Sequence, residues 1–386
     1  MPTLLLHFLL FLITTTVTNL IPAVHSNCIE AQQQSLLHFK QSLEFDSSES
    51  SKLITWNSST ECCAWLGVTC STIGSVVGLD ISNESISCSI DNSSSLFQLQ
   101  HLQSLNLADN NFKSSSIPSA IGKLTELRYL NLSDAFFSGV IPIEISRLTR
   151  LITLDLSSNS YPSFAENQNL SMLIQNLTEL TELYLDSVVL SGQGSDWCEA
   201  ISSSLPNLRV LSLSGCRLSG PICDSLAKLQ SLQEIDLSLN QLNGSIPSSV
   251  VSLPKLERLT LSHNRFSGQV PEFSNTSSPL FDTLYLENNN LEGQIPTSIF
   301  NLHGLLFLNL SSNNFSGFPF NGPRLPRNLS SVNLSNNSML FDYNGSKSSF
   351  LQIRHLILAS NKLRAFPDFL RNQSILYHLD LSNNQI

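Results

Sequence analysis

Eight cysteines are the residues of this sequence whose spacing most clearly predicts chemistry. Four of them cluster near the N-terminus, at Cys28, Cys62, Cys63 and Cys70, and flank a segment whose apolar residues fall on one helical face. Such a cluster predicts either disulfides or a zinc site. Adjacent Cys62 and Cys63 cannot easily aim both sulfurs at one tetrahedral centre, and a secreted chain oxidises its thiols. We therefore expect disulfides and no bound metal.

Residue patterns typical of enzymes are missing from the sequence. It contains no GxSxG, no HExxH, no phosphate-binding loop and no kinase glycine loop, and the lone GQG at 192–194 does not open a helix after a strand. The eight His are scattered. We predict a non-enzymatic chain that needs no cofactor.

The first 26 residues predict the compartment. An apolar run from Leu4 to Val17 is followed by Pro22 and by small residues, Val24 and Ser26, at the positions that a signal peptidase reads. A membrane anchor is the alternative, but His7 and three Thr interrupt the run, which is short for a span. We expect a cleaved signal peptide at 1–26. No later stretch is apolar and long enough to cross a bilayer, so the chain as it stands would be secreted.

Charge excludes some classes of partner. The chain has a net charge of −10, and only 13% of its residues are charged, without runs of one sign. Such a chain offers no basic surface for nucleic acid or for an acidic membrane. We expect partners to recognise particular groups of surface residues and not the net charge of the chain.

From Val76 onward one spacing recurs, in which apolar residues alternate before a position that is usually Asn. We call this position the slot. The slots are 23 to 29 residues apart, most often 24, which is typical of a leucine-rich repeat array. We predict a cap at 27–75 and about thirteen repeats over 76–386, the last incomplete. The slot residues are Glu84, Asn110, Ala135, Asn159, Val188, Cys216, Asn240, Asn264, Asn289, Asn313, Asn337, Asn361 and Asn384.

The position of each residue within the repeat accounts for its type. Leu232, Ile235 and Leu237 would point inward from a short strand, while the residues between them face solvent on a concave parallel sheet. Each unit buries half of itself and its neighbour covers the rest. The slot Asn is expected to turn inward and bond to backbone groups. The stretches 161–179 and 193–207 exceed the period, and we expect them to bulge as surface loops; a ligand-facing role is the alternative.

The sequence is rich in Asn-x-Ser/Thr acceptor sites for N-glycans. Three of them, Asn131, Asn309 and Asn333, fall on the exposed face of predicted strands, where glycans would mask repeats 3, 10 and 11. The others are Asn57, Asn83, Asn92, Asn169, Asn176, Asn243, Asn275, Asn314, Asn328, Asn336, Asn344 and Asn372.

Between these positions, from 180 to 290, aromatic and charged residues occupy the outward strand positions. We call this set the concave strip and predict that it contacts a ligand; ordinary polar surface is the alternative. Its members are Tyr184, Asp186, Arg209, Glu234, Asp236, Glu257, Arg258, Thr260, His263, Asp282, Tyr285 and Glu287.

The second half of the unit narrows the family. The segments LNGSIPSS (242–249), FSGQVPEF (266–273), LEGQIPTSIF (291–300) and FSGVIPIEI (137–145) resemble the plant extracellular repeat class, LxGxIP. ECCAWLGVTC (61–70) is similar to the N-terminal cap of plant receptors, and 196–222 resembles the receptor-like proteins of the Cf and Ve type. The resemblance implies an α/β repeat solenoid with a disulfide-bonded cap. It also implies further repeats, a second cap, a membrane span and a short tail that are not in this sequence, as in an N-terminal fragment.

The resemblance also implies a function. A receptor-like protein of this family binds a pathogen- or self-derived peptide, protein or glycan at the cell surface, and signals in defence through a partner receptor kinase. Two alternatives use the same repeat: a secreted inhibitor similar to polygalacturonase-inhibiting proteins, and the ectodomain of a receptor kinase. The sequence downstream of residue 386 would distinguish them.

Cysteine pairing is predicted partly from this family. We expect Cys28–Cys62 and Cys63–Cys70, because adjacent Cys point apart and the family cap resembles this arrangement. Cys198 and Cys223 should lie on the convex side of adjacent units, within disulfide reach. A Cys198–Cys216 bond is the alternative; otherwise Cys88 and Cys216 remain thiols.

Overall fold

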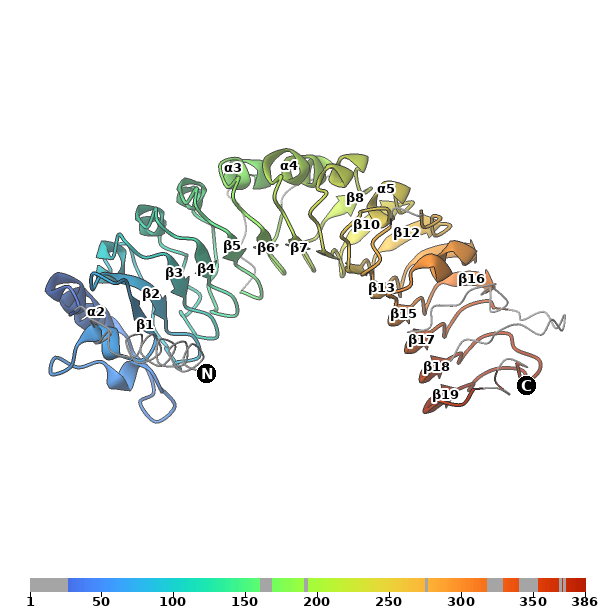
Figure 1. Cartoon of the computed structure of the whole chain (residues 1–386), viewed down its shortest axis with the longest axis horizontal. Helices are drawn as coiled ribbons and strands as arrows, with labels where there is room; N and C mark the ends of the chain where they lie inside the picture. Colours follow the sequence, from blue (N-terminus) through green and yellow to red (C-terminus); the bar gives the residue numbers. More distant parts are fainter. Residues whose placement is uncertain are drawn as a thin grey trace, which may run out of the picture.

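The computed structural model describes residues 27–159, 169–190, 194–274, 277–317, 329–339, 353–367, 370 and 373–386. The predicted signal peptide, 1–26, lies outside these ranges. The described chain forms an arch, with strands along its inner side and short helices along its outer side (Figure 1). The N-terminal cap and the last strand lie at opposite ends of the arch.

The inner side is a sheet that has fourteen strands in the described ranges. The first pair is antiparallel, and each later strand pairs in parallel with the equivalent strand of the next unit. In spatial order the strands are β1 (Val68–Cys70), β2 (Val76–Asp80), β3 (Ser104–Asn106), β4 (Tyr129–Asn131), β5 (Thr153–Asp155), β6 (Glu182–Tyr184), β7 (Val210–Ser212), β9 (Glu234–Asp236), β11 (Arg258–Thr260), β13 (Thr283–Tyr285), β15 (Phe307–Asn309), β17 (Ser331–Asn333), β18 (His355–Ile357) and β19 (His378–Asp380).

Stacked apolar rows hold these strands together. The strand pairing aligns Leu211, Ile235, Leu259, Leu284 and Leu308 in one row, and all five are at least 98% buried. Fully burying such a side chain stabilises the fold by about 1.5–3 kcal/mol. The row continues from unit to unit because the period places an apolar residue at the same point each time. The predicted leucine-rich repeat solenoid is confirmed.

The slot residues bond each unit to the preceding one. Asn264 donates from Nδ2 to the carbonyl oxygens of Leu237, Leu261 and Ser262 at 2.8–3.2 Å, and its Oδ1 accepts from the Leu242 N–H at 3.0 Å. Leu237 and Leu242 belong to the preceding unit. The amide therefore satisfies the backbone where the chain leaves the strand, as the repeat pattern predicts, and it also fixes the register between neighbours.

Four slots hold a residue other than Asn, and two of them show how a different side chain serves the same position. Glu84 is fully buried and accepts from Ser50, from Ser51 and from the N–H groups of Lys52 and Leu53, all in the cap. A carboxylate suits this slot because the preceding neighbour is a cap loop that offers several donors. Cys216 replaces the Asn donor with a thiol, 3.0 Å from the Leu185 carbonyl oxygen.

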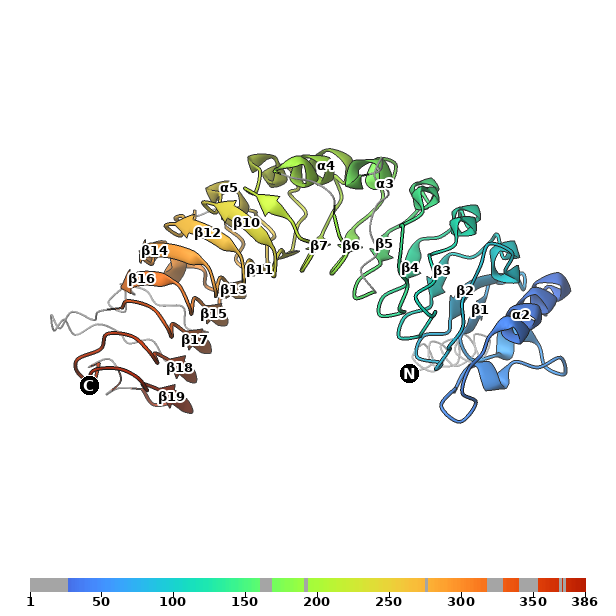
Figure 2. The ribbon, with the colours of Figure 1, turned by 180° about the vertical axis from the view of Figure 1, so that it is seen from behind.

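A second, five-stranded sheet lies beside the first, between the concave and convex sides (Figure 2). The repeat pattern does not predict it. At Gly220 in this sheet φ is +83°, and a Cβ would lie 2.6 Å from the Gly194 Cα, so the glycine of the LxGxIP motif is required. The five strands are β8 (Ser219–Gly220), β10 (Gln241–Gly244), β12 (Arg265–Gly268), β14 (Asn290–Gln294) and β16 (Asn314–Gly317).

The outer side carries one short helix in most units, and the proline of the motif directly precedes several of them. The α-helices are α2 (Glu30–Ser42), α3 (Leu170–Ile174), α4 (Asp196–Ser204) and α5 (Ser248–Val251). The 3₁₀-helices are η1 (Leu53–Thr55), η2 (Cys62–Ala64), η3 (Ser95–Gln98), η4 (Ser119–Lys123), η5 (Ile143–Arg147), η6 (Asp224–Lys228) and η7 (Thr297–Asn301).

The prediction that the two long inserts bulge as loops is wrong for their described parts. Residues 169–179 and 194–207 contain α3 and α4, which lie on the outer side of the arch (Figure 1). Leu173, Ile174, Trp197 and Ile201 are buried against the core. The apolar residues of each insert recur at helical spacing, so burial favours a packed helix over a loop.

The cap covers the first repeat. Helix α2 buries Leu36 and Phe39, and the rings of Trp56 and Trp65 stack with centroids 5.5 Å apart. Two disulfides join Cys28 to Cys62 and Cys63 to Cys70. The predicted disulfide-bonded cap is confirmed.

Candidate functional site: the concave strip

The twelve residues of the concave strip lie on or beside five neighbouring strands of the first sheet, β6, β7, β9, β11 and β13. Tyr184, Asp236, Thr260 and Tyr285 lie in one row across the sheet, which Ser212 completes. Glu234 and Arg258 face each other in the next row. Arg209, Glu257 and Asp282 precede their strands, whereas Asp186, His263 and Glu287 follow theirs. Arg209, Arg258 and His263 are exposed, and the other nine are half-buried.

The described part of the strip contains few ion pairs. Arg258 forms a salt bridge with Glu234, whereas Arg209 donates from Nε and Nη2 to the Gln233 amide oxygen at 3.1 and 2.7 Å. Asp186 accepts from the Ser212 hydroxyl and the Ser214 N–H, both at 2.7 Å. Among the described residues the strip therefore contains one ion pair, between Arg258 and Glu234, whereas neutral groups donate to Asp186.

Burial and negative charge shift the titration of several groups here. Burial raises the pKa of Tyr184 to about 12, and the carboxylates of Glu182, Glu234 and Asp155 add to the shift. Burial likewise raises the pKa of Asp186, with smaller contributions from Asp236 and Asp155. Nearby carboxylates therefore add to the effect of burial on both groups.

Two buried polar atoms next to each other on the concave side have no hydrogen-bond partner among the described residues. These are the Ser262 hydroxyl, in a residue only 3% exposed, and Oε2 of Glu287. Ser262 and Glu287 follow paired strands at equivalent positions, because Thr260 pairs with Tyr285. Whether such an atom has a hydrogen-bond partner depends on side-chain conformations, which the sequence pattern does not specify.

Eleven of the fifteen predicted glycan acceptors lie in the described ranges; Asn275, Asn328, Asn344 and Asn372 lie outside them. Asn131, Asn309 and Asn333 are half-buried on β4, β15 and β17, on either side of the strip. Asn243 and Asn314 lie on strands of the second sheet, β10 and β16. The other six, Asn57, Asn83, Asn92, Asn169, Asn176 and Asn336, are exposed.

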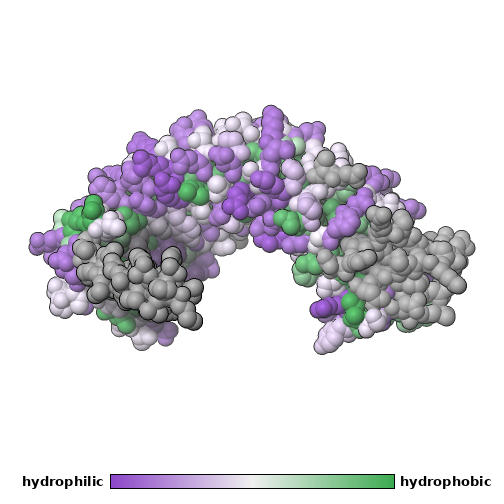
Figure 3. Space-filling model, in the orientation of Figure 1, coloured by the Kyte–Doolittle hydropathy of each residue, from purple (hydrophilic) through white to green (hydrophobic). Residues whose placement is uncertain are grey.

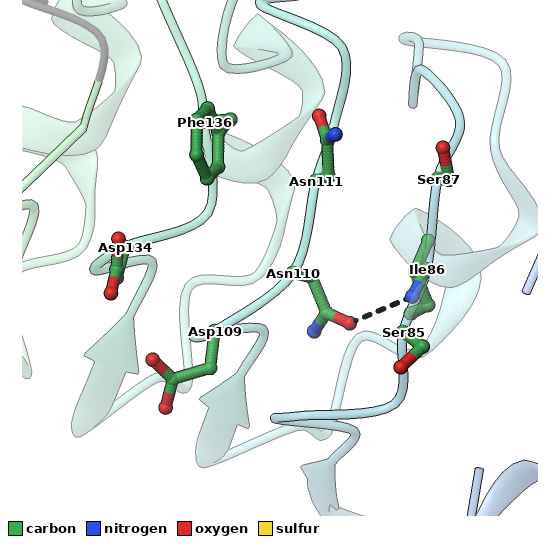
Figure 4. Close-up of a pocket in the computed structure, with 8 residues that line it drawn as sticks. All are labelled: Ser85, Ile86, Ser87, Asp109, Asn110, Asn111, Asp134 and Phe136. Carbon is green, nitrogen blue, oxygen red and sulfur yellow. Dashed lines mark hydrogen bonds between the residues drawn. The ribbon is translucent and has the colours of Figure 1, made fainter. Parts of the chain in front are cut away.

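A shallow pocket of about 350 Å³ lies outside the strip, where repeats 1 to 3 leave the sheet. Figure 4 shows Asp109 and Asp134 close to the ends of their strands, with Phe136 and Asn111 further along the chain. The Phe136 side chain is 50% exposed. Asn110, Ile86, Ser85 and Ser87 complete the lining, and Asn110 binds the Ile86 N–H as the slot residue of its unit. The repeat pattern does not predict this pocket.

The remaining cysteines pair across the convex side. A disulfide joins Cys198 of α4 to Cys223, which precedes η6 in the next unit, and Cys88 and Cys216 are buried thiols. Burial raises the pKa of both thiols. The sulfurs of Cys28, Cys62 and Cys63 lie within 4.8 Å of one another, as three metal ligands would, but each forms a disulfide.

Within the described ranges no helix is both long and apolar enough to span a bilayer. Hydrophilic residues cover most of the visible surface over the middle of the arch (Figure 3). This surface is typical of a repeat protein whose apolar residues face its own core.

Comparison with known proteins decides the family. Residues 82–314 match the leucine-rich repeat region family, and residues 29–71 match the leucine rich repeat N-terminal domain. Receptor-like protein 6 of Arabidopsis thaliana is 36% identical over an alignment of 234 residues, and the match covers 53% of this chain and 22% of that protein. The chain belongs to the leucine-rich repeat receptor-like proteins of plants. This family is not enzymatic, which confirms the prediction from the sequence.

Solved ectodomains of receptor kinases share the fold of this receptor-like protein. The ectodomain of the plant membrane receptor kinase GASSHO1/SCHENGEN3 from Arabidopsis thaliana, in complex with CASPARIAN STRIP INTEGRITY FACTOR 2, matches with a TM-score of 0.74. It is 30% identical and covers 91% of this chain and 41% of that one. Arabidopsis HAESA, in complex with the peptide hormone IDA and the co-receptor SERK1, matches with a TM-score of 0.64 at 25% identity, over 92% and 70% of the two chains.

Proposed function

We propose that this receptor-like protein recognises a pathogen- or self-derived peptide, protein or glycan at the outer face of the plasma membrane. It would use the concave strip for contact and signal in defence through a partner receptor kinase. The observation that carries the proposal is the strip itself: two tyrosines and several charged groups in aligned rows on a rigid sheet, between strands that carry glycan acceptors.

The physical reason is preorganisation. Backbone bonds between neighbouring strands hold the row of Tyr184, Asp236 and Tyr285, so a ligand that binds there orders few protein groups. Half-buried tyrosines supply contact area and a hydroxyl at low entropic cost. The two receptor-kinase ectodomains were solved with CASPARIAN STRIP INTEGRITY FACTOR 2 and with the peptide hormone IDA, the second also with a co-receptor, and these complexes support ligand recognition and partner binding by this fold.

A test uses the full-length protein encoded by the transcript, expressed in leaves and challenged with culture filtrates of leaf-infecting microbes. We expect one filtrate to trigger an oxidative burst and to cause a receptor kinase to co-purify with the protein. A Tyr184→Ala, Tyr285→Ala double variant at equal surface abundance should lose both responses. If the variant responds like the parent to every active filtrate, the strip is not the contact surface.

A receptor-kinase ectodomain is the second candidate, because such an ectodomain matches this chain with a TM-score of 0.74. The transcript beyond residue 386 distinguishes the candidates. A membrane span with a short tail selects the receptor-like protein, and a kinase signature selects the receptor kinase. A cysteine cap followed by a stop codon would instead select a secreted inhibitor.

A further inference from the structure

The pocket of repeats 1 to 3 lies outside the concave strip and has no part in the proposed function. Its volume of about 350 Å³ is at the lower end of small-molecule sites, which range from about 300 to 1,000 Å³. The exposed carboxylates of Asp109 and Asp134 line it without a hydrogen-bond partner among the described residues (Figure 4). Asn111 Oδ1 accepts from the Lys113 N–H at 3.0 Å, and its amide NH₂ group has no such partner. The pocket therefore offers both acceptors and a donor that the described protein does not use.

Phe136 is the aromatic wall of this pocket, and its neighbours hold it in place. The N–H groups of Ala135 and Phe137, on either side of it, both donate to Asn159 Oδ1, at 3.1 and 3.0 Å. Phe136 itself is 50% exposed and has a φ of +54°, a conformation that is rare for a bulky residue. Ser85 occupies the equivalent position two units earlier, with a φ of +52°. The fold therefore does not require a ring here, and the ring presents an apolar face to the pocket.

A glycan acceptor, Asn83, lies in the same row as the two carboxylates. It precedes the slot residue of its unit, as Asp109 and Asp134 do in theirs, and the three residues have φ values of 54°, 55° and 49°. The Asn83 N–H donates to the Ala108 carbonyl oxygen at 3.0 Å, which joins this position to the next unit. Asn83 is exposed, and its side-chain amide has no hydrogen-bond partner among the described residues. The serine of its acceptor sequence, Ser85, lines the pocket, so a glycan on Asn83 begins at the pocket's edge.

We propose that this pocket binds the core of the N-glycan attached to Asn83. One face of an N-acetylglucosamine ring packs on Phe136, sugar hydroxyls donate to the two carboxylates, and an acetamido oxygen accepts from Asn111. Neighbouring units are about 4.8 Å apart, so Phe136 lies about 10 Å from Asn83, across two units. The first two sugars of an N-glycan span a comparable length. This inference goes beyond the proposed function, because it concerns how the receptor-like protein binds its own glycan.

Covalent attachment favours this glycan over a free saccharide. A shallow pocket with one aromatic ring binds a free sugar weakly, because association costs translational and rotational freedom. A tethered sugar has an effective concentration in the millimolar range, so it occupies a site that a dilute free sugar leaves empty. The bound glycan also removes the Phe136 ring from water. The occupant to which the structure points is therefore part of the same molecule.

The test uses the whole chain, secreted from plant cells that make only high-mannose glycans, with the occupancy of Asn83 measured by glycopeptide mass spectrometry. An endoglycosidase that cuts between the two N-acetylglucosamine rings is added to the folded chain, and release is followed at each acceptor. We expect release to be about fivefold slower at Asn83 than at Asn57, which lies in an exposed segment of the cap. Phe136→Ser should remove this difference. The matched control, Phe366→Ser, removes a ring that is 55% exposed elsewhere on the chain and should preserve it.

Two further measurements separate a glycan contact from a structural role of Phe136. Asn83→Gln should lower the unfolding temperature of the parent but not that of the Phe136→Ser variant, because the second chain already lacks the contact. Free di-N-acetylchitobiose at millimolar concentration should bind the Asn83→Gln variant and not the glycosylated parent, whose own glycan fills the pocket.

Four results would each overturn the proposal. They are an Asn83 without a glycan, equal release at Asn83 and Asn57 in the parent, the same acceleration by Phe136→Ser and Phe366→Ser, and an equal effect of Asn83→Gln in both backgrounds. Saturable binding of free chitobiose by the glycosylated parent would also contradict it, since a free saccharide would then be the occupant.

Discussion

At the scale of single residues, one amide per repeat decides how precisely the units stack. Asn240, Asn264 and Asn289 each donate to one carbonyl of the preceding unit and two of their own, and each accepts one N–H from the preceding unit. The slot was predictable because its position repeats with the period. Its link to the preceding unit became visible only in the structure.

Asn264→Ala should destabilise repeats 7 to 9 by about 2–3 kcal/mol, because it leaves buried backbone groups of two units without partners. Hydrogen exchange resolved along 232–289 measures this loss. The effect should be confined to these repeats, because each repeat is stabilised mainly by its direct neighbours. Asn290→Ala, at an exposed position on β14, is the control and should change protection little. Equal effects of the two substitutions would contradict the role of the slot.

Glu84 makes the contact between cap and repeats sensitive to pH. Burial opposes its ionisation, but hydrogen bonds from Ser50, Leu53, Lys52 and Ser51 outweigh burial and hold its pKa below the usual 4.5. A lowered pKa in the folded state stabilises the protein above the unfolded pKa, and this contribution is lost as the pH falls through the folded value.

Proteolysis of the cap should therefore accelerate below about pH 4.5 in the parent chain. Glu84→Gln should be cleaved faster at pH 7 and should show a weaker pH dependence, since its amide cannot accept the same set of donors. Glu49→Gln, an exposed neighbour, is the control. A parent and a Glu84→Gln variant with the same pH profile would refute this role of Glu84.

At the scale of elements, the strand rows could be predicted and the outer side could not. Alternation of apolar residues within each unit specifies which residues of β6, β7, β9, β11 and β13 share a row. The second sheet consists of two- to five-residue strands with exposed polar residues, so it produces no apolar pattern. The inserts did contain a signal for helices, because Leu170, Leu173 and Ile174 recur at helical spacing. The prediction of loops used only the fact that the inserts are longer than the repeat period.

The disulfide between Cys198 and Cys223 should hold α4 on the outer side. It closes a loop of 25 residues, so Cys198→Ser with Cys223→Ser should cost about 2–4 kcal/mol and increase hydrogen exchange within 196–204. In the parent chain, alkylation under denaturing, non-reducing conditions should label Cys88 and Cys216 only. Label on Cys198 or Cys223 would contradict this pairing.

The last described unit should exchange faster than the middle of the array when the 386-residue chain is expressed by itself. Tyr377 is 86% exposed, and Leu379 and Leu381 are half-buried, whereas Leu259 and Leu261 of repeat 8 are fully buried. Fewer buried contacts lower the free energy of local opening. Hydrogen exchange as slow over 376–386 as over 232–266 would show that this end is as stable as the middle.

At the scale of the whole molecule, an arch of stacked units presents one continuous concave sheet. The members of the strip could be predicted, because outward positions follow from strand alternation. The ion pair between Arg258 and Glu234 and the two buried atoms without partners, Ser262 Oγ and Glu287 Oε2, depend on side-chain conformations of neighbouring units, which the repeat pattern does not specify.

The most direct test of the strip as a contact surface is to place a glycan on it. In the full-length protein, Tyr285→Asn with Glu287→Ser creates an acceptor site on β13, and Glu292→Asn with Gln294→Ser creates one on β14 of the second sheet. The oxidative burst in leaves is measured after addition of a filtrate that activates the parent, with glycan occupancy verified by mass spectrometry. We predict that the glycan on β13 abolishes the burst and that the glycan on β14 leaves it intact; a full burst from the β13 variant would contradict the proposal.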